Sequence, residues 1–140
     1  MDYNTNNSNN ASTEPAAPRK KIILWVEDDL MIGTILGNKL IAAGYDLIHV
    51  SGGEEALYQL KQVVPSLIVL DILLPGINGF DVLSKIKADS SLKDIPVIIL
   101  SNVSRDSDID KANAMGVKKF LVKPTTSLEE IIAEVKIWCK

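Results

Sequence analysis

The sequence has 140 residues, which suits one globular domain and is too short for two of ordinary size. Hydrophobic residues make up 46% of it and aromatic residues only 5%, so the core must be aliphatic. A formal net charge of −3 excludes a strongly basic nucleic-acid-binding domain, and no apolar run reaches the roughly 18 residues of a membrane helix. The single Cys139 cannot form an internal disulfide, which fits a reducing cytoplasm.

The first 18 residues differ in composition from the rest of the chain. They are rich in Asn, Ser, Thr, Ala and Pro and offer almost no apolar surface to bury. Burial of so little surface cannot offset the entropy lost on ordering, and the segment lacks the apolar centre of a signal peptide. We therefore expect a disordered tail over 1–18 and one domain over 19–140.

Five short runs rich in β-branched residues then predict five strands. In chain order they are KKIILWV (20–26), DLIHV (46–50), SLIVLD (66–71), PVIILS (96–101) and KFLVK (119–123). Three of them are almost continuously apolar, which is typical of strands buried on both faces of a parallel sheet.

Five segments with helical spacing alternate with these strands. In the first, apolar residues recur every three to four positions and Gly44 supplies the stop; they are Leu30, Ile32, Ile35, Leu36, Leu40 and Ile41. The others span about 53–63, 79–87, 106–115 and 128–139, and Ser127 with Glu130 forms a capping box before the last. Regular alternation predicts an α/β fold: a doubly wound, five-stranded parallel sheet with five helices.

The carboxyl ends of the strands are where such a sheet binds ligands. The first strand ends in the acids Glu27-Asp28-Asp29, the third in Asp71, the fourth in Ser101-Asn102 and the fifth in Lys123-Pro124. Carboxylates that converge repel one another unless one keeps a proton or a cation lies among them. An all-oxygen set of ligands suits Mg²⁺ better than zinc.

The same strand ends argue against other phosphate-binding folds. A dinucleotide-binding domain needs a glycine-rich turn after its first strand, where this chain has three acids, and no P-loop motif is present. A phosphatase of the haloacid dehalogenase type would need a second Asp two residues after its nucleophile, and that position is Leu73.

From about residue 20 to 140 the chain resembles the receiver domains of bacterial response regulators. The resemblance lies in the runs IILWVEDD, LIVLDILLPGINGFDVL, IPVIILS and FLVKP, in that order. It implies a flavodoxin-like (βα)5 receiver fold and a cytoplasmic, chemotaxis-regulator-like, single-domain switch of a two-component phosphorelay.

The resemblance assigns a role to each strand-end residue. Asp71 is implied to accept a phosphoryl group from a sensor histidine kinase or a histidine phosphotransfer protein. Mg²⁺ is implied to be held by Asp28 directly, by Glu27 through a water, by Asp71 and by the Leu73 backbone carbonyl. Asp29 is instead expected to cap the first helix.

Three further residues are implied to respond to the phosphoryl group. Lys123 should pair with Asp71 before transfer and with phosphoryl oxygens afterwards, and its bond to Pro124 is typically cis in this family. Ser101 should hydrogen-bond a phosphoryl oxygen, and Phe120 matches the switch aromatic that turns inward.

A few positions stand outside this pattern. Asn102 occupies a position where a very small residue is common, bordering the path to the phosphoryl group. Leu73 and Val103 flank the site with apolar groups, which predicts a long-lived phosphoryl group. His49 is expected to lie far from the acidic edge, as a structural residue. Trp25 and Trp138 are expected to be packing residues.

With only Lys140 after the last helix, the output is expected to be a contact with an unknown downstream protein. The fourth helix, fifth strand and fifth helix are the expected surface, with Ile109, Ala112 and Asn113 as candidates, and a phosphorylation-dependent homodimer is a further partner to consider. Direct binding of nucleic acid and insertion into a membrane are not expected.

One alternative is a phosphorylation-independent interaction domain (a pseudo-receiver). A small Mg²⁺-dependent phosphatase ranks last, because the chain lacks a separate general acid–base, so we expect no enzyme beyond its own phosphorylation and dephosphorylation.

Overall fold

The structure is a computed structural model that describes residues 20–103 and 105–140. The tail predicted over residues 1–18 lies outside the described residues. The elements run in the order β1 (Ile22–Val26), α2 (Leu30–Ala42), β2 (Asp46–Val50), α3 (Gly53–Leu60), β3 (Leu67–Leu70), α4 (Gly79–Ala88), β4 (Val97–Ser101), α5 (Asp106–Ala114), β5 (Lys119–Val122), the short 3₁₀ helix η1 (Lys123–Thr125) and α6 (Leu128–Trp138).

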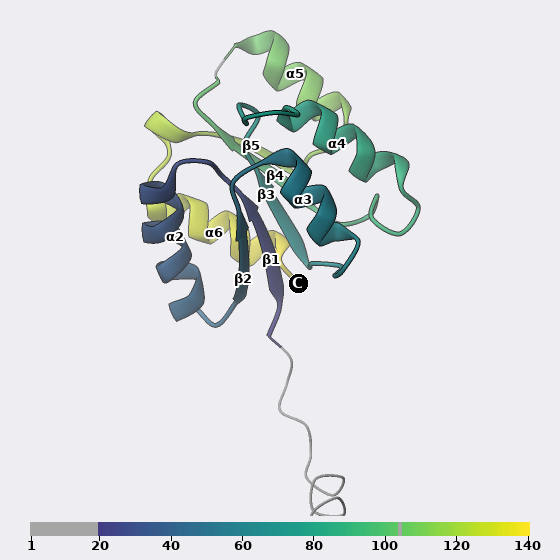
Figure 1. The fold of residues 1–140 in the computed structure, drawn as a ribbon. Helices are drawn as coiled ribbons and strands as arrows, with labels where there is room; N and C mark the ends of the chain where they lie inside the picture. Colours follow the sequence, from purple (N-terminus) through teal and green to yellow (C-terminus); the bar gives the residue numbers. More distant parts are fainter. Residues whose placement is uncertain (1–19, 104) are drawn as a thin grey trace, which may run out of the picture.

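All five described strands pair in parallel in one sheet, in the order β2-β1-β3-β4-β5. Helices α2 and α6 cover one face of this sheet, and α3, α4 and α5 cover the other (Figure 1). Every residue of β3 and β4 is buried, as their continuous apolar runs predict. The doubly wound architecture is therefore confirmed.

Each face of the sheet carries its own aliphatic core. One cluster joins β1, β3 and β4 to α3 and α4 through residues such as Leu83 and Ile86, and the other joins the same strands to α2 and α6. Trp25 is buried in the second cluster and Trp138 packs against it, which confirms both as packing residues.

Most helix ends agree with the predicted ends to within one residue, and the Ser127–Glu130 capping box is present. Helix α3 is the exception, because it ends at Leu60 rather than Val63. There the chain tightens into hydrogen bonds three residues apart, from Lys61 N to Tyr58 O and from Gln62 N to Gln59 O.

Helix α2 does not direct all of its regularly spaced apolar residues inward. Leu36 and Leu40 are buried, whereas three other large apolar side chains are exposed; these are Leu30 at 70%, Ile35 at 47% and Ile41 at 52%. Gly33 and Gly37 face β2 instead, so close that an added Cβ would lie 2.6 Å from His49 Cε1 and 2.9 Å from Leu47 Cδ2, respectively. Two glycines thus allow a close approach of helix and strand. No helix in the described part of the chain is both long enough and apolar enough to cross a bilayer.

Candidate functional site

Two neighbouring strands place the acidic residues at one edge of the sheet. The parallel ladders continue for one residue past β1 and β3, because Glu27 N donates to Val50 O at 3.0 Å and Asp71 N donates to Val26 O at 3.1 Å. The backbone of both acids is thereby tied to the sheet. The predicted meeting of strand ends at one edge is confirmed.

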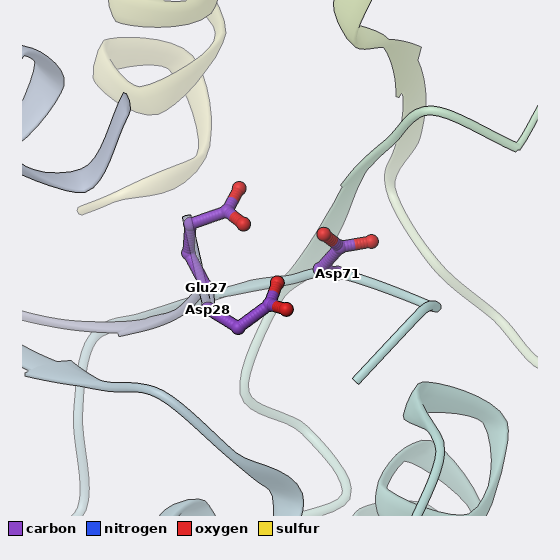
Figure 2. Close-up of side chains that lie close together, drawn as sticks. All are labelled: Glu27, Asp28 and Asp71. Carbon is purple, nitrogen blue, oxygen red and sulfur yellow. The ribbon is translucent and has the colours of Figure 1, made fainter. Parts of the chain in front are cut away.

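Glu27, Asp28 and Asp71 each direct a carboxylate oxygen into one small region, where these atoms all lie within 4.8 Å of one another (Figure 2). Glu27 is 1% exposed and Asp71 is 4% exposed, while Asp28 is exposed to solvent. The site is therefore shielded from solvent at Glu27 and Asp71 and open to solvent at Asp28.

Lys123 supplies the positive charge of this cluster. Its Nζ lies 2.8 Å from Asp71 Oδ2 and 2.5 Å from Glu27 Oε1, and its side chain is only 8% exposed. The expectation of a cis bond to Pro124 is wrong for this structure, since no cis peptide bond occurs among the described residues. The 3₁₀ turn of η1, which starts at Lys123 itself, accompanies the inward direction of the lysine.

Asp71 has a partner on each oxygen. Oδ2 accepts a hydrogen bond from Lys123, whereas Oδ1 accepts one from Ser101 Oγ at 2.7 Å and another from Leu73 N at 3.1 Å. Ser101 is fully buried, and its own Oγ accepts from Val103 N at 3.3 Å. The carboxylate of Asp71 is thus held in one orientation.

The electrostatics of the site favour a divalent cation. Three carboxylates and one ammonium leave a formal charge of −2, and the donor atoms are all carboxylate oxygens. Hard cations such as Mg²⁺ prefer this set. The residues present therefore fit the ion that the resemblance implies, with Glu27, Asp28 and Asp71 as the residues that would hold it.

Burial and pairing shift two groups in the cluster. Burial raises the pKa of the Glu27 carboxyl, against the lowering effects of Lys123 and of the Asp29 backbone N–H. Burial alone lowers the pKa of Lys123, but its bonds to Asp71 and Glu27 outweigh that effect, so the net pKa is raised. Lys123 therefore stays charged at neutral pH, beside a Glu27 carboxylate whose charge the site disfavours.

Two residues next to the cluster differ in how well their roles were predicted. Asp29 Oδ1 accepts from Ile32 N at 3.2 Å, which confirms it as the cap of α2. The prediction that His49 lies far from the acidic edge is wrong, because His49 Nε2 lies 2.8 Å from the backbone oxygen of Glu27. The parallel register, which pairs Trp25 with His49, brings the ring to the same end of the sheet.

The chain between β3 and the start of α4 packs closely against its neighbours. A Cβ on Gly79 would collide with the carbonyl oxygen of Asp71 and lie 2.7 Å from Ile72 Cα. The carboxylate of Glu54, on α3, accepts from Ile77 N at 3.2 Å. This Glu54 contact was not predicted, because no motif in the sequence signals it.

Other predicted residues occupy different positions around the site. Phe120 is half-buried against the cluster that includes α3 and α4. Leu73 is 58% exposed and Asn102 is also exposed. On the expected output surface, Ile109 is half-buried and Asn113 is exposed, but Ala112 is 0% exposed. Ala112 is therefore a core residue, and its prediction as a contact residue was wrong.

Comparison with known proteins places this geometry in one family. The model of the response regulator receiver domain matches residues 23–136. A "Probable transcriptional regulator ycf27" from Porphyridium aerugineum is 35% identical over 111 residues, which cover 79% of this chain and 45% of that protein. An "Uncharacterized transcriptional regulatory protein YcbL" from Bacillus subtilis is 36% identical over 115 residues, covering 81% of this chain and 48% of that protein. The chain thus spans less than half the length of these curated relatives.

Solved structures show the same architecture. The Mn²⁺-bound form of the response regulator Rcp1 superposes with a TM-score of 0.79 and 27% identity, over 86% of this chain and 95% of that one. The phosphorylated cyanobacterial phytochrome response regulator RcpA gives a TM-score of 0.77 and 28% identity, over 86% and 94% of the two chains. From residue 23 to 136, this chain therefore belongs to the response regulator receiver domain family.

Proposed function

We propose that the domain is a cytoplasmic phosphorylation switch in which Asp71 accepts a phosphoryl group with the help of Mg²⁺. The observation that carries the proposal is the position of Asp71: a buried carboxylate, fixed through both oxygens, beside one lysine and two further acids. A merely structural acid at a strand end would not need two more carboxylates within 4.8 Å. Such a cluster is costly unless it binds a cation.

The donor is a phosphohistidine on a sensor histidine kinase or a histidine phosphotransfer protein. An oxygen of Asp71 attacks phosphorus in line, the new P–O bond forms, and the P–N bond to the histidine breaks with its electron pair leaving on nitrogen. The product is an acyl phosphate on Asp71. Such a transfer depends on positioning and charge stabilisation rather than on covalent help from other residues.

Each neighbour of Asp71 has a task in this transfer. Lys123 Nζ, already 2.8 Å from Asp71 Oδ2, stays beside the group and pairs with phosphoryl oxygens. Ser101 Oγ exchanges its bond to Asp71 Oδ1 for one to a phosphoryl oxygen. Glu27, Asp28, Asp71 and the Leu73 carbonyl would hold Mg²⁺, which when bound supplies charge neutralisation for the phosphoryl oxygens.

The signal leaves the domain through contacts with another protein. Movement of Ser101 draws in the loop after β4, and Phe120, packed beside the core, turns inward as that loop shifts. A phosphoryl group adds about −1.5 to −2 charges, enough to bias such a rearrangement. The domain acts on no external substrate and catalyses only its own phosphorylation and dephosphorylation.

Intact-mass spectrometry after incubation with acetyl phosphate tests the proposal. The wild-type protein should gain one phosphoryl group with Mg²⁺ and none in EDTA, and Asp71→Asn should gain none. Asp46→Asn, at the exposed opposite end of β2, is the matched control and should behave as wild type. No gain by the wild type under any condition would contradict the proposal and favour the phosphorylation-independent interaction domain.

A further inference from the structure

The side chain of His49 contacts the main chain of Glu27, at the end of β1. Its Nε2 lies 2.8 Å from the Glu27 backbone oxygen. A carbonyl oxygen can only accept, so Nε2 carries the proton and donates it. The amide N–H of Glu27 is bonded to Val50 O within the extended ladder. Both sides of residue 27 are therefore tied to β2, one by main chain and one by His49.

Gly33 provides the space that this arrangement needs. It lies in the interior of α2, where glycine is less favourable than alanine by about 0.5–1 kcal/mol. An added Cβ would lie 2.6 Å from His49 Cε1 and 2.9 Å from His49 Nε2. The helix thus has a poor helix former at the position over which the ring packs.

The bond acts on the one peptide unit that joins two of the proposed metal ligands. The Glu27 carbonyl belongs to the planar peptide between Glu27 and Asp28, so fixing that oxygen fixes the plane and the start of Asp28. The carboxylates of Glu27 and Asp28 both extend toward the region shared with Asp71 (Figure 2).

We propose that His49 is a positioning residue of the cation site. Through the Glu27 carbonyl it orients the Glu27–Asp28 peptide so that both carboxylates are in place before a divalent cation binds, and Gly33 gives its ring room to do so. The inference rests on the proposed function in that the cation is taken to be Mg²⁺.

Isothermal titration with Mg²⁺ at one fixed pH, on the full chain, tests this role. Mutation of a residue that orients a metal ligand typically lowers the affinity for the metal 10–100-fold. Because His49 is exposed to solvent, we expect a loss of Mg²⁺ affinity of about 10-fold for His49→Ala. His49→Gln keeps an N–H donor that can reach the Glu27 carbonyl, so its Mg²⁺ affinity should fall by less than about three-fold. A purely structural role would lower the melting temperature of His49→Ala but leave its Mg²⁺ affinity unchanged, and that result would overturn the proposal.

A double-mutant cycle with Gly33 tests the same contact independently. Gly33→Ala should weaken Mg²⁺ binding and lower stability in the wild type, because the new methyl group displaces the ring. In the His49→Ala background the same change should raise stability, since only the gain in helix propensity remains. Gly37→Ala, whose Cβ would meet only Leu47 Cδ2 at 2.9 Å, is the matched control and should leave Mg²⁺ affinity unaltered. Equal effects of Gly33→Ala in both backgrounds would overturn the inference.

The outcomes separate this inference from the proposed function. If the wild type binds Mg²⁺ and is phosphorylated by acetyl phosphate while His49→Ala binds Mg²⁺ equally well, the inference fails and the function stands. If the wild type binds Mg²⁺ without being phosphorylated, the function fails, and the affinities of the variants still decide the role of His49. Absence of Mg²⁺ binding by the wild type would overturn both.

Discussion

Replacing Lys123 with methionine should reveal how strongly the carboxylates of Glu27 and Asp71 repel each other. The side chain keeps its length, but Glu27 and Asp71, both more than nine-tenths buried, lose the ammonium that lies 2.5 and 2.8 Å from their oxygens. Their oxygens lie within 4.8 Å of each other. At an effective dielectric constant near 20, that separation corresponds to a repulsion of at least about 3 kcal/mol.

This repulsion sets the expected loss of stability. Removing one partner of a buried ion pair typically costs about 3–5 kcal/mol, so Lys123→Met should lower the free energy of unfolding by about 3 kcal/mol in EDTA. Mg²⁺ should restore part of the loss, because a ligand at 100 times its dissociation constant stabilises by about 2.7 kcal/mol. The variant should gain more than the wild type at equal Mg²⁺, since its site carries one more uncompensated negative charge.

Urea unfolding followed by circular dichroism, in EDTA and in Mg²⁺, measures both effects. Lys119→Met, which removes an exposed lysine from β5, is the control and should change stability by less than about 0.5 kcal/mol. Equal stability of Lys123→Met and wild type in EDTA would refute the reasoning. So would an equal gain from Mg²⁺ in the two proteins.

Three further changes test other parts of the account. Because burial raises the pKa of Glu27 above its ordinary 4.5, the native state binds more protons than the unfolded state, and ionised Glu27 lowers stability as pH rises from 4.5. Glu27→Gln in EDTA should therefore gain stability relative to wild type between pH 4.5 and 7, in urea unfolding at each pH. Gly79→Ala should lower the free energy of unfolding by about 3 kcal/mol, because its Cβ would collide with the Asp71 carbonyl oxygen. Ser127→Ala should lower it by about 1 kcal/mol through loss of the α6 capping box, without changing Mg²⁺ affinity by titration calorimetry.

Each of these has a result that would count against it. A constant stability difference between Glu27→Gln and wild type across that pH range would mean that Glu27 has no raised pKa. Gly52→Ala is the control for Gly79, since its Cβ would lie 3.9 Å from the nearest atoms, and equal effects of the two substitutions would refute the packing argument. A changed Mg²⁺ affinity in Ser127→Ala would show that α6 is coupled to the acidic site.

The strand ends were predictable because two rules act together. Continuous apolar runs mark strands buried on both faces, and parallel strands bring their carboxyl ends to one edge. The meeting of Glu27, Asp28 and Asp71 follows from those rules alone. The roles of individual residues required the family resemblance, and the phosphoryl transfer itself stays a prediction.

What sequence reasoning could not supply is the distance between side chains on neighbouring elements. His49 was placed far from the acidic edge from the topology alone, yet the register of β2 against β1 brings its ring to the Glu27 carbonyl. The spacing of apolar residues in α2 indicates a helix correctly but not which side faces the sheet. There the glycines, not Leu30 or Ile41, face β2, because close packing against a strand favours the absence of a side chain.

Two predictions were wrong: the cis bond before Pro124 and the surface position of Ala112. The first came from the family alone, and here the inward direction of Lys123 goes together with a 3₁₀ turn and no cis bond among the described residues. The second also came from family analogy, which does not fix the rotation of α5 about its own axis, and that rotation directs Ala112 into the core. Neither error affects the cluster around Asp71.

Locating the acyl phosphate within the chain tests whether Asp71 is the phosphoryl acceptor. After phosphorylation with acetyl phosphate and Mg²⁺, borohydride reduction converts a phosphorylated aspartate to homoserine, and peptide mass spectrometry identifies the residue changed. We expect homoserine at position 71 and at no other aspartate, with the reaction abolished in EDTA. Homoserine at position 28, or none despite Mg²⁺ binding, would contradict it.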